Sequence, residues 1–160
     1  TQYRNAAESL RRRLSKQGDI PNISLLVDLG NLISIRYALP VAFFDQASVT
    51  GATTVRFADG SESFTDLGTD EPVQPEAGEV IFVDDGAQVS ARRWCWRQSA
   101  HSATGPATTE ALVTMEGHHT TAADDVRAAV SDLAGLLRVH QPDATLTIAE
   151  LSPDAPSFRP

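Results

Sequence analysis

Residues 91–98 read Ala-Arg-Arg-Trp-Cys-Trp-Arg-Gln and form the most unusual stretch of this 160-residue chain. The stretch contains both tryptophans, the only cysteine and three arginines. As a single β-strand it would alternate its side chains between two faces. The face with both tryptophans comprises Arg92, Trp94, Trp96 and Gln98, and the opposite face comprises Arg93, Cys95 and Arg97. Tryptophan beside arginine can stack on a nucleobase or hold a carboxylate or phosphate.

The same stretch has a purely structural alternative. It would then be a core strand whose arginines pair with some of the 21 acidic side chains of this chain. Cys95 also has two interpretations. The guanidinium groups of Arg93 and Arg97 would lower the pKa of its thiol if they lie beside it, whereas a buried thiol would be inert.

Composition limits the class of protein. A chain of 160 residues with 41% hydrophobic and 21% charged residues is typical of one soluble globular domain. A single cysteine excludes an internal disulfide and a multi-cysteine zinc site. No apolar run approaches the roughly 20 residues of a membrane-spanning helix, and residues 1–9 do not resemble a signal peptide. We therefore expect a cytoplasmic protein with no membrane partner.

The charge and the ends of the chain give two further expectations. A formal net charge of -8 argues against a broad phosphate-binding face but not against a local basic patch. We expect a single domain over residues 1–150 and a flexible tail over residues 151–160. Because the chain starts at Thr1 rather than Met, we also expect an N-terminal part of the full protein to be missing.

Hydrophobic spacing predicts an α+β layout. Helices are expected over residues 5–16 and 121–140, while residues 23–37 fit either a helix or a strand plus a turn. The expected strands are residues 43–45, 53–57, 63–65, 79–83, 87–92, 112–115 and 145–148. Asp59-Gly60 predicts a tight hairpin between the second and third of these strands, and residues 70–78 are expected to form a loop.

The histidines carry little chemistry. His118 and His119 are adjacent, so their side chains diverge and would not share a metal ion. His101 has serine neighbours, but no third group orients it as a catalytic base, and we expect it to be solvated in a loop. The sequence also lacks a glycine-rich phosphate loop and a nucleophile elbow. We predict no metal site and no cofactor.

Several short motifs together carry a family resemblance. They are Leu-Val-Asp-Leu-Gly-Asn at 26–31, Arg-Tyr-Ala-Leu-Pro at 36–40, Gly-Glu-Val-Ile-Phe-Val-Asp-Asp at 78–85, Arg-Arg-Trp-Cys-Trp-Arg-Gln at 92–98 and Glu-Gly at 116–117. The set resembles the freestanding B3/B4-domain proteins, which are similar to the editing domain of the phenylalanyl-tRNA synthetase β subunit. The resemblance covers roughly residues 3–137, and the run at 92–98 is its most specific part. It implies an α+β fold, a layered β-sandwich of unusual topology with flanking helices.

The resemblance also implies a function. Freestanding members resemble trans-editing hydrolases, which deacylate misacylated aminoacyl-tRNA by attack of water on the aminoacyl ester. The implied partners are the acceptor end of a misacylated tRNA and its amino acid. Two alternatives stay open: a non-catalytic module of the same fold that binds an amino acid or a tRNA 3′ end, and an enzyme acting on another aminoacyl ester or amide.

The family's site residues transfer only position by position. Gln98 stands where the synthetase domain has a glutamate, and Ala42 stands where its Pro-x-His-x-Phe-Asp run has histidine, so the synthetase's specificity is not carried over. Gln98 and Glu116 are the catalytic candidates, Glu116 as an amine anchor or water-orienting group. Backbone N–H groups at Gly117 or Gly86 are candidates for an oxyanion site. The substrate-binding candidates are Asn31, Arg92, Arg93, Trp94, Trp96, Arg97 and Thr108.

Overall fold

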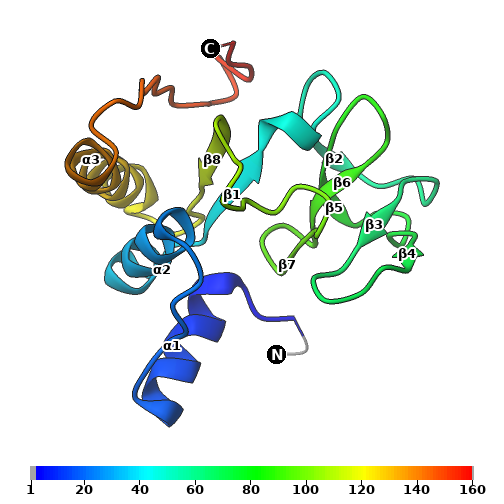
Figure 1. Cartoon of the computed structure of the whole chain (residues 1–160). Coiled ribbons are helices and arrows are strands. Elements are labelled where there is room, and N and C mark those ends of the chain that lie inside the picture. Colours follow the sequence, from blue (N-terminus) through cyan, green and yellow to red (C-terminus); the bar gives the residue numbers. More distant parts are fainter. Residues whose placement is uncertain (1–2, 160) are drawn as a thin grey trace.

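The computed structural model of the protein describes residues 3–159 (Figure 1). Within these residues the chain forms three α-helices, α1 (Ala6–Gln17), α2 (Leu25–Tyr37) and α3 (Ala122–His140), and a short 3-10 helix η1 (Gln46–Ser48). The strands are β1 (Val41–Asp45), β2 (Thr54–Phe57), β3 (Phe64–Thr65), β4 (Pro72–Val73), β5 (Val80–Val83), β6 (Val89–Arg92), β7 (Arg97–Gln98) and β8 (Ala111–Met115). None of the described helices combines the length and hydropathy that crossing a bilayer requires.

The helix ends follow from local capping. The side chain of Asn5 accepts a hydrogen bond from the backbone N–H of Glu8 at 2.8 Å, and Gly18 ends α1 with φ 78°. Ser24 caps α2 in the same way, which settles the ambiguity of residues 23–37 in favour of a helix. The predicted first and last helices are confirmed within one or two residues at each end.

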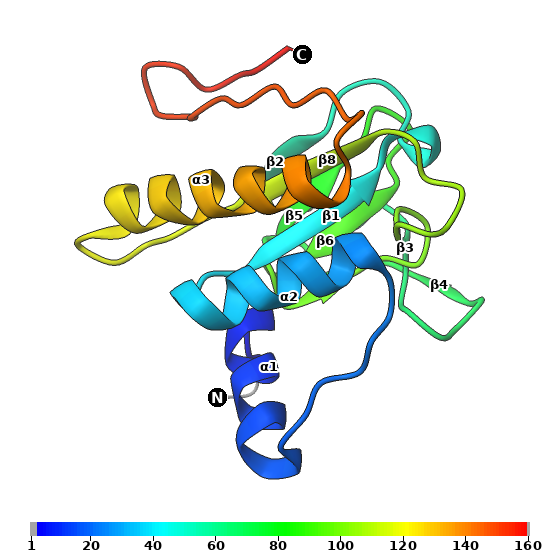
Figure 2. The ribbon, with the colours of Figure 1, turned by 60° about the vertical axis from the view of Figure 1, so that its left-hand side comes forward.

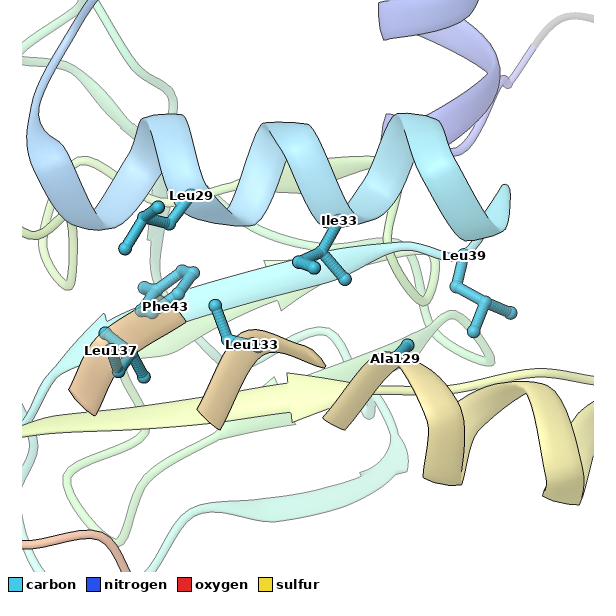
Figure 3. Close-up of a cluster of buried hydrophobic side chains, with 7 residues drawn as sticks. All are labelled: Leu29, Ile33, Leu39, Phe43, Ala129, Leu133 and Leu137. Atoms are coloured by element: carbon cyan, nitrogen blue, oxygen red, sulfur yellow. The ribbon is translucent and has the colours of Figure 1, made fainter. Parts of the chain in front are cut away.

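Strands β1 and β8 form an antiparallel ribbon at the centre of the molecule, with Phe44 opposite Leu112. On one face of this ribbon, Phe43 packs against side chains of α2 and α3 (Figure 3). The buried cluster comprises Leu29, Ile33, Leu39, Phe43, Ala129, Leu133 and Leu137. Each large side chain buried here contributes about 1.5–3 kcal/mol, so α2 and α3 are held on this face.

The opposite face of the ribbon meets a second sheet of order β2-β5-β6-β7. Phe44 packs there with Phe82 and Ala91, and Ala42 and Leu112 lie against them. Figures 1 and 2 show the ribbon between the helices and this larger sheet. The expected α+β fold of stacked layers is confirmed, and the boundary between the ribbon and the larger sheet positions the site described below.

The hairpin predicted at Asp59-Gly60 is wrong. Strand β2 pairs with β5, and β3 pairs with β4. The buried carboxylate of Glu62 explains the difference, because it accepts hydrogen bonds from the backbone N–H groups of Asp59 at 3.1 Å and Gly60 at 3.0 Å and pairs with Arg56. These contacts close the loop on itself and turn the chain away from β2.

Two further strand expectations differ from the structure. Residues 145–148 form no strand, because no strand among the described residues pairs with them, although Leu146 packs against the helical core. The stretch expected to be a loop over 70–78 contains the two-residue strand β4. Residues 151–159 are exposed throughout, and the flexible tail stays a prediction.

Candidate functional site

Residues 91–98 form a hairpin rather than one strand. Strand β6 ends at Arg92 and β7 begins at Arg97, and these two residues pair across the hairpin. Four residues, 93–96, form the turn between them, and two of these, Arg93 at φ 49° and Trp94 at φ 60°, have the left-handed backbone conformation. The predicted alternation of side chains along 91–98 is therefore wrong, since the turn redirects every residue after Arg92.

A small cavity of about 80 Å³ lies where this hairpin meets the β1–β8 ribbon and the start of α1. A volume of this size accommodates several water molecules. Its wall contains apolar side chains and a few polar ones. The lining residues are Ala6, Pro40, Val41, Ala42, Ala91, Cys95, Trp96, Arg97, Gln98, Thr114 and Glu116.

Gln98 is a fixed polar group of this wall. Its side-chain amide donates a hydrogen bond from Nε2 to the carbonyl oxygen of Phe43 at 2.5 Å. This contact joins β7 to β1 and sets the orientation of the amide. The remaining oxygen, Oε1, is an acceptor for a water molecule or an ammonium group.

Glu116 follows the last residue of β8, and its side chain is 19% exposed. Burial raises the pKa of this carboxyl, while His118, with its ring nitrogen 3.6 Å from the carboxylate, and the thiol of Cys95 act in the opposite direction. A carboxylate whose pKa is raised is a stronger proton acceptor near neutral pH. Glu116 is thus the one ionisable carboxylate of the cavity wall.

Cys95 lies against Glu116 in the same wall. Burial, followed by the charge of Glu116, raises the pKa of its thiol to about 11. Of the two interpretations of Cys95, the buried, inert thiol is the one that fits, because the guanidinium groups of Arg93 and Arg97 are engaged with carboxylates instead. The thiol is protonated at neutral pH and is a poor nucleophile.

The hairpin arginines are all paired with acidic side chains. Glu79, only 6% exposed, receives a bidentate contact from Arg92 and a second arginine, Arg93, at 3.0 Å. Arg97 pairs with Asp66 at 3.0 Å. The structural alternative for this stretch is therefore correct in its main point: these cations neutralise nearby carboxylates.

The two tryptophans lie in different surroundings. The ring of Trp96 meets Tyr3 edge-on at 4.9 Å, and the guanidinium of Arg97 lies 5.0 Å from its centre. Trp94 is 41% exposed, and its ring meets His118 edge-on at 4.9 Å. It borders an open cleft of about 460 Å³ lined by Tyr3, Glu76, Ala77, Gly78, Glu79, Val80, Arg93 and Trp94. Of the two tryptophans, Trp94 is the exposed one.

Comparison with known proteins identifies the family. The sequence model of the B3/4 domain matches residues 1–132. This chain belongs to the B3/4 domain family. The resemblance drawn from its motifs is confirmed.

Two relatives of this B3/4 domain are larger proteins. The phenylalanine–tRNA ligase beta subunit of Streptomyces avermitilis is 35% identical over 77 residues, which are 48% of this chain and 9% of that protein. The crystal structure of an N-terminal fragment of the phenylalanyl-tRNA synthetase beta subunit from Pyrococcus horikoshii superposes with a TM-score of 0.57 at 12% identity, over 73% of this chain and 41% of that one. The B3/4 domain therefore spans a small part of the first relative and under half of the second.

The B3/4 domain brings four of the predicted site residues together at the cavity: Trp96, Arg97, Gln98 and Glu116. Arg93 and Trp94 lie at the neighbouring cleft. The three remaining candidates, Asn31, Arg92 and Thr108, line neither hollow. The hydroxyl of Thr108 donates to Asp45 at 2.6 Å, and Asn31 lies half-buried within α2.

Sequence reasoning missed several lining residues of the cavity, among them Thr114 and Ala6. Thr114 is opposite Ala42 in the ribbon and shares a strand face with Leu112, so the period of two along residues 112–116 could have indicated it. Ala6 carries no local signal, because α1 reaches the cavity only through the tertiary fold. Gly86 is already engaged, since its N–H donates to Asp84 at 2.9 Å. The backbone N–H of Gly117, the residue after Glu116, stays a predicted candidate for the oxyanion site.

The wall of this cavity combines three chemical properties. It offers a neutral amide oxygen at Gln98, a carboxylate with a raised pKa at Glu116 and an apolar lining from residues such as Ala42. Such a set can orient a water molecule, hold an ammonium group and accept a proton. In the part of the chain that the structure describes, no three His, Cys, Asp or Glu side chains gather to hold a metal ion.

Proposed function

We propose that this domain is a trans-acting aminoacyl-tRNA deacylase, which hydrolyses the ester between an amino acid and the 3′ end of a misacylated tRNA. The observation that supports this proposal most is the convergence of Gln98 and Glu116 on one cavity of a B3/4 domain. The relatives that the chain matches are beta subunits of phenylalanine–tRNA ligases. Gln98 and Ala42, both in this wall, are also the positions where the sequence departs from the synthetase pattern.

The proposed mechanism uses positioning more than strong acid–base chemistry. An aminoacyl ester is already activated, so an oriented water molecule is sufficient for attack. Gln98 Oε1 holds the attacking water or the α-ammonium group, and Glu116 takes the other of these two partners. The raised pKa of Glu116 suits it to accept the proton that the water releases. The terminal ribose hydroxyl of the tRNA assists.

The size of the cavity bears on the amino acid. A volume of about 80 Å³ bordered by Ala42, Val41 and Ala91 fits a small apolar side chain better than an aromatic one. Outside the cavity, the exposed ring of Trp94 is the group that would stack on the terminal base of the tRNA. Stacking of one base on an aromatic ring contributes about 1–3 kcal/mol.

The test is a deacylation assay with a panel of mischarged tRNAs. Gln98→Ala and Glu116→Gln should each slow hydrolysis by about tenfold or more, the scale of a lost positioning or proton-transfer contact. Glu150→Gln is a matched control, because Glu150 is an exposed carboxylate that pairs with Arg127 and lines neither hollow. If the wild-type domain turns over no mischarged tRNA in the panel, the proposal fails.

One observation favours a second candidate function, a non-catalytic module that binds an amino acid or a tRNA 3′ end. Gln98 cannot ionise, and its Nε2 is committed to the carbonyl of Phe43. Saturable binding of a non-hydrolysable aminoacyl-tRNA analogue without turnover of the matching ester would support this reading. Hydrolysis of small aminoacyl esters or amides with no preference for tRNA would instead support an enzyme on another aminoacyl substrate.

A further inference from the structure

The unpaired cations of this protein lie mainly on α1. Four basic side chains follow one another along this helix, and all are exposed: Arg11, Arg12, Arg13 and Lys16. We call them the α1 cationic face. In the part of the chain that the structure describes, no ion pair includes any of the four. The arginines of the hairpin, by contrast, are all neutralised by carboxylates.

The charge of the chain is divided accordingly. Residues 1–18 contain five basic side chains and one acidic one, Glu8, a formal charge of +4. Residues 19–160 contain the other eight basic and twenty acidic side chains, a formal charge of −12. A polyanion is therefore repelled by most of the molecule and attracted at α1.

The position of α1 connects this charge to the cavity. Ala6, the first residue of the helix, lines the cavity, and its backbone N–H donates to the carbonyl oxygen of Cys95 at 3.1 Å. At 1.5 Å per residue, Arg12 lies about 9 Å and Lys16 about 15 Å farther along the helix axis. Figures 1 and 2 show α1 extending away from the body of the molecule, so the helix leads outward from the cavity.

The orientation of α1 leaves the cations free. Ala7 is buried and Leu10 half-buried, on the side where α1 packs against α2. With 3.6 residues per turn, Arg12 and Lys16 lie on the opposite side of the helix, and Arg13 lies on its flank, where its side chain is exposed. Their side chains have no structural role in holding α1 to the domain, since the apolar side does that.

We propose that the α1 cationic face binds the phosphodiester backbone of the RNA stem whose aminoacylated end enters the cavity. This inference rests on the proposed deacylase function and names the surface that would grip its substrate. A tRNA carries its ester at the end of a polyanionic stem, and the stem must lie near the cavity when the ester is inside it. Guanidinium groups bind phosphate through paired hydrogen bonds, and each contact releases counterions. An acidic protein is the competing partner, but nothing about that partner requires contact beside the cavity.

A binding experiment with matched charge changes tests the proposal. tRNA that carries no amino acid is titrated with the wild-type chain, with R12Q/R13Q and with R138Q/R159Q, over a series of salt concentrations. The control also removes two exposed arginines that belong to no ion pair among the described residues. We expect R12Q/R13Q to bind about tenfold more weakly and to lower the slope of log affinity against log salt by about 1.5. The control should match the wild type.

A second readout separates this inference from the deacylase proposal. Aminoacyl-adenosine carries the ester without any phosphate, so R12Q/R13Q should hydrolyse it at the wild-type rate while losing activity on aminoacyl-tRNA. If the wild type hydrolyses neither ester, the deacylase proposal fails, and the binding series still judges α1. Equal tRNA affinity and salt slope in R12Q/R13Q and the wild type would overturn the inference. Absence of tRNA binding by the wild type at low salt would also overturn it and would favour an acidic protein partner.

Discussion

The β6–β7 hairpin and α1 both contain a run of basic side chains, but within residues 3–159 those of the hairpin are paired with carboxylates and those of α1 are not. In the hairpin, Arg92 and Arg93 both form ion pairs with the buried carboxylate of Glu79, which neutralises charge within the fold. On α1, the cations face solvent without a carboxylate partner among the described residues. The difference shows that a run of arginines does not by itself indicate phosphate binding. An arginine is available to bind phosphate only if it does not already form an ion pair with a carboxylate of the same chain.

The largest loss of stability is expected when the carboxylate of Glu79 is removed from the hairpin. Glu79→Ala leaves Arg92 and Arg93, only 12% and 15% exposed, without their shared carboxylate. Loss of one partner of a buried ion pair costs about 3–5 kcal/mol because a charge stays buried and uncompensated. Urea denaturation followed by circular dichroism measures the change in the free energy of unfolding.

Glu76→Ala is the control for that prediction. Glu76 pairs with the same arginine, Arg93, at 3.0 Å, but its side chain is 78% exposed. We expect a loss of less than about 1 kcal/mol, as for other exposed ion pairs. Equal losses in the two variants would mean that the hairpin arginines do not depend on the buried carboxylate.

Acid should lower the stability of the fold by protonating the carboxylate of Glu79. Burial alone would raise the pKa of Glu79, but hydrogen bonds from Arg92 and from the backbone N–H of Glu76 outweigh it and hold the pKa below its ordinary value. A carboxyl with a lowered folded-state pKa stabilises the fold above its unfolded pKa, and this stability is lost as the pH falls through the folded value. Wild-type stability should therefore fall below about pH 5 more steeply than that of Glu79→Gln. Parallel pH profiles would contradict this account.

The sequence could predict the elements better than their connections. The helices at both ends and the strands at 79–83, 87–92 and 112–115 follow from hydrophobic spacing and capping, which are local properties. Strand β2 pairs with β5, and the buried carboxylate of Glu62 organises the loop 58–62 that follows β2. A charged residue is expected at the surface, so its structural role could not be read from the sequence.

The site was predictable only where local sequence motifs identify its residues. The motif residues Gln98 and Glu116 do meet at the cavity, and a family resemblance selected them. The turn at Arg93 and Trp94 was not predictable, since both are bulky residues in a conformation that favours glycine or asparagine. The pairing of the hairpin arginines with Glu79 and Asp66 depends on tertiary contacts across 13 to 31 residues of sequence.

A smaller effect on stability is expected at Trp94, the more exposed of the two tryptophans. Trp94 has φ 60°, which costs a residue other than glycine about 1–3 kcal/mol, and the residue is 41% exposed. Trp94→Gly removes that strain along with the edge contact to His118. We expect the free energy of unfolding to change by no more than about 1 kcal/mol. If the proposed stacking of a tRNA base on Trp94 is correct, tRNA affinity should fall in the same variant.

Trp96→Gly provides the contrast for Trp94. Trp96 is half-buried, lies outside the left-handed region and packs against Tyr3 and Arg97. We expect it to lose more stability than Trp94→Gly in the same denaturation experiment, because packed aromatic contacts disappear without any relief of strain. The reverse order would indicate that Trp94, not Trp96, supports the hairpin.

The smallest effect, with the opposite sign, should come from α1. Arg13 has Lys16 three residues ahead on the helix and Arg12 beside it, and no carboxylate pairs with it among the described residues. Like charges at this spacing cost a helix about 0.2–0.5 kcal/mol, and glutamine has nearly the helix propensity of arginine. Arg13→Gln should therefore raise the free energy of unfolding slightly at low salt, and added salt should remove the gain by screening the repulsion. A loss of stability would instead show that Arg13 has a structural partner. A gain would mean that the cation opposes folding, which is the expected behaviour of a charge retained to bind a polyanion.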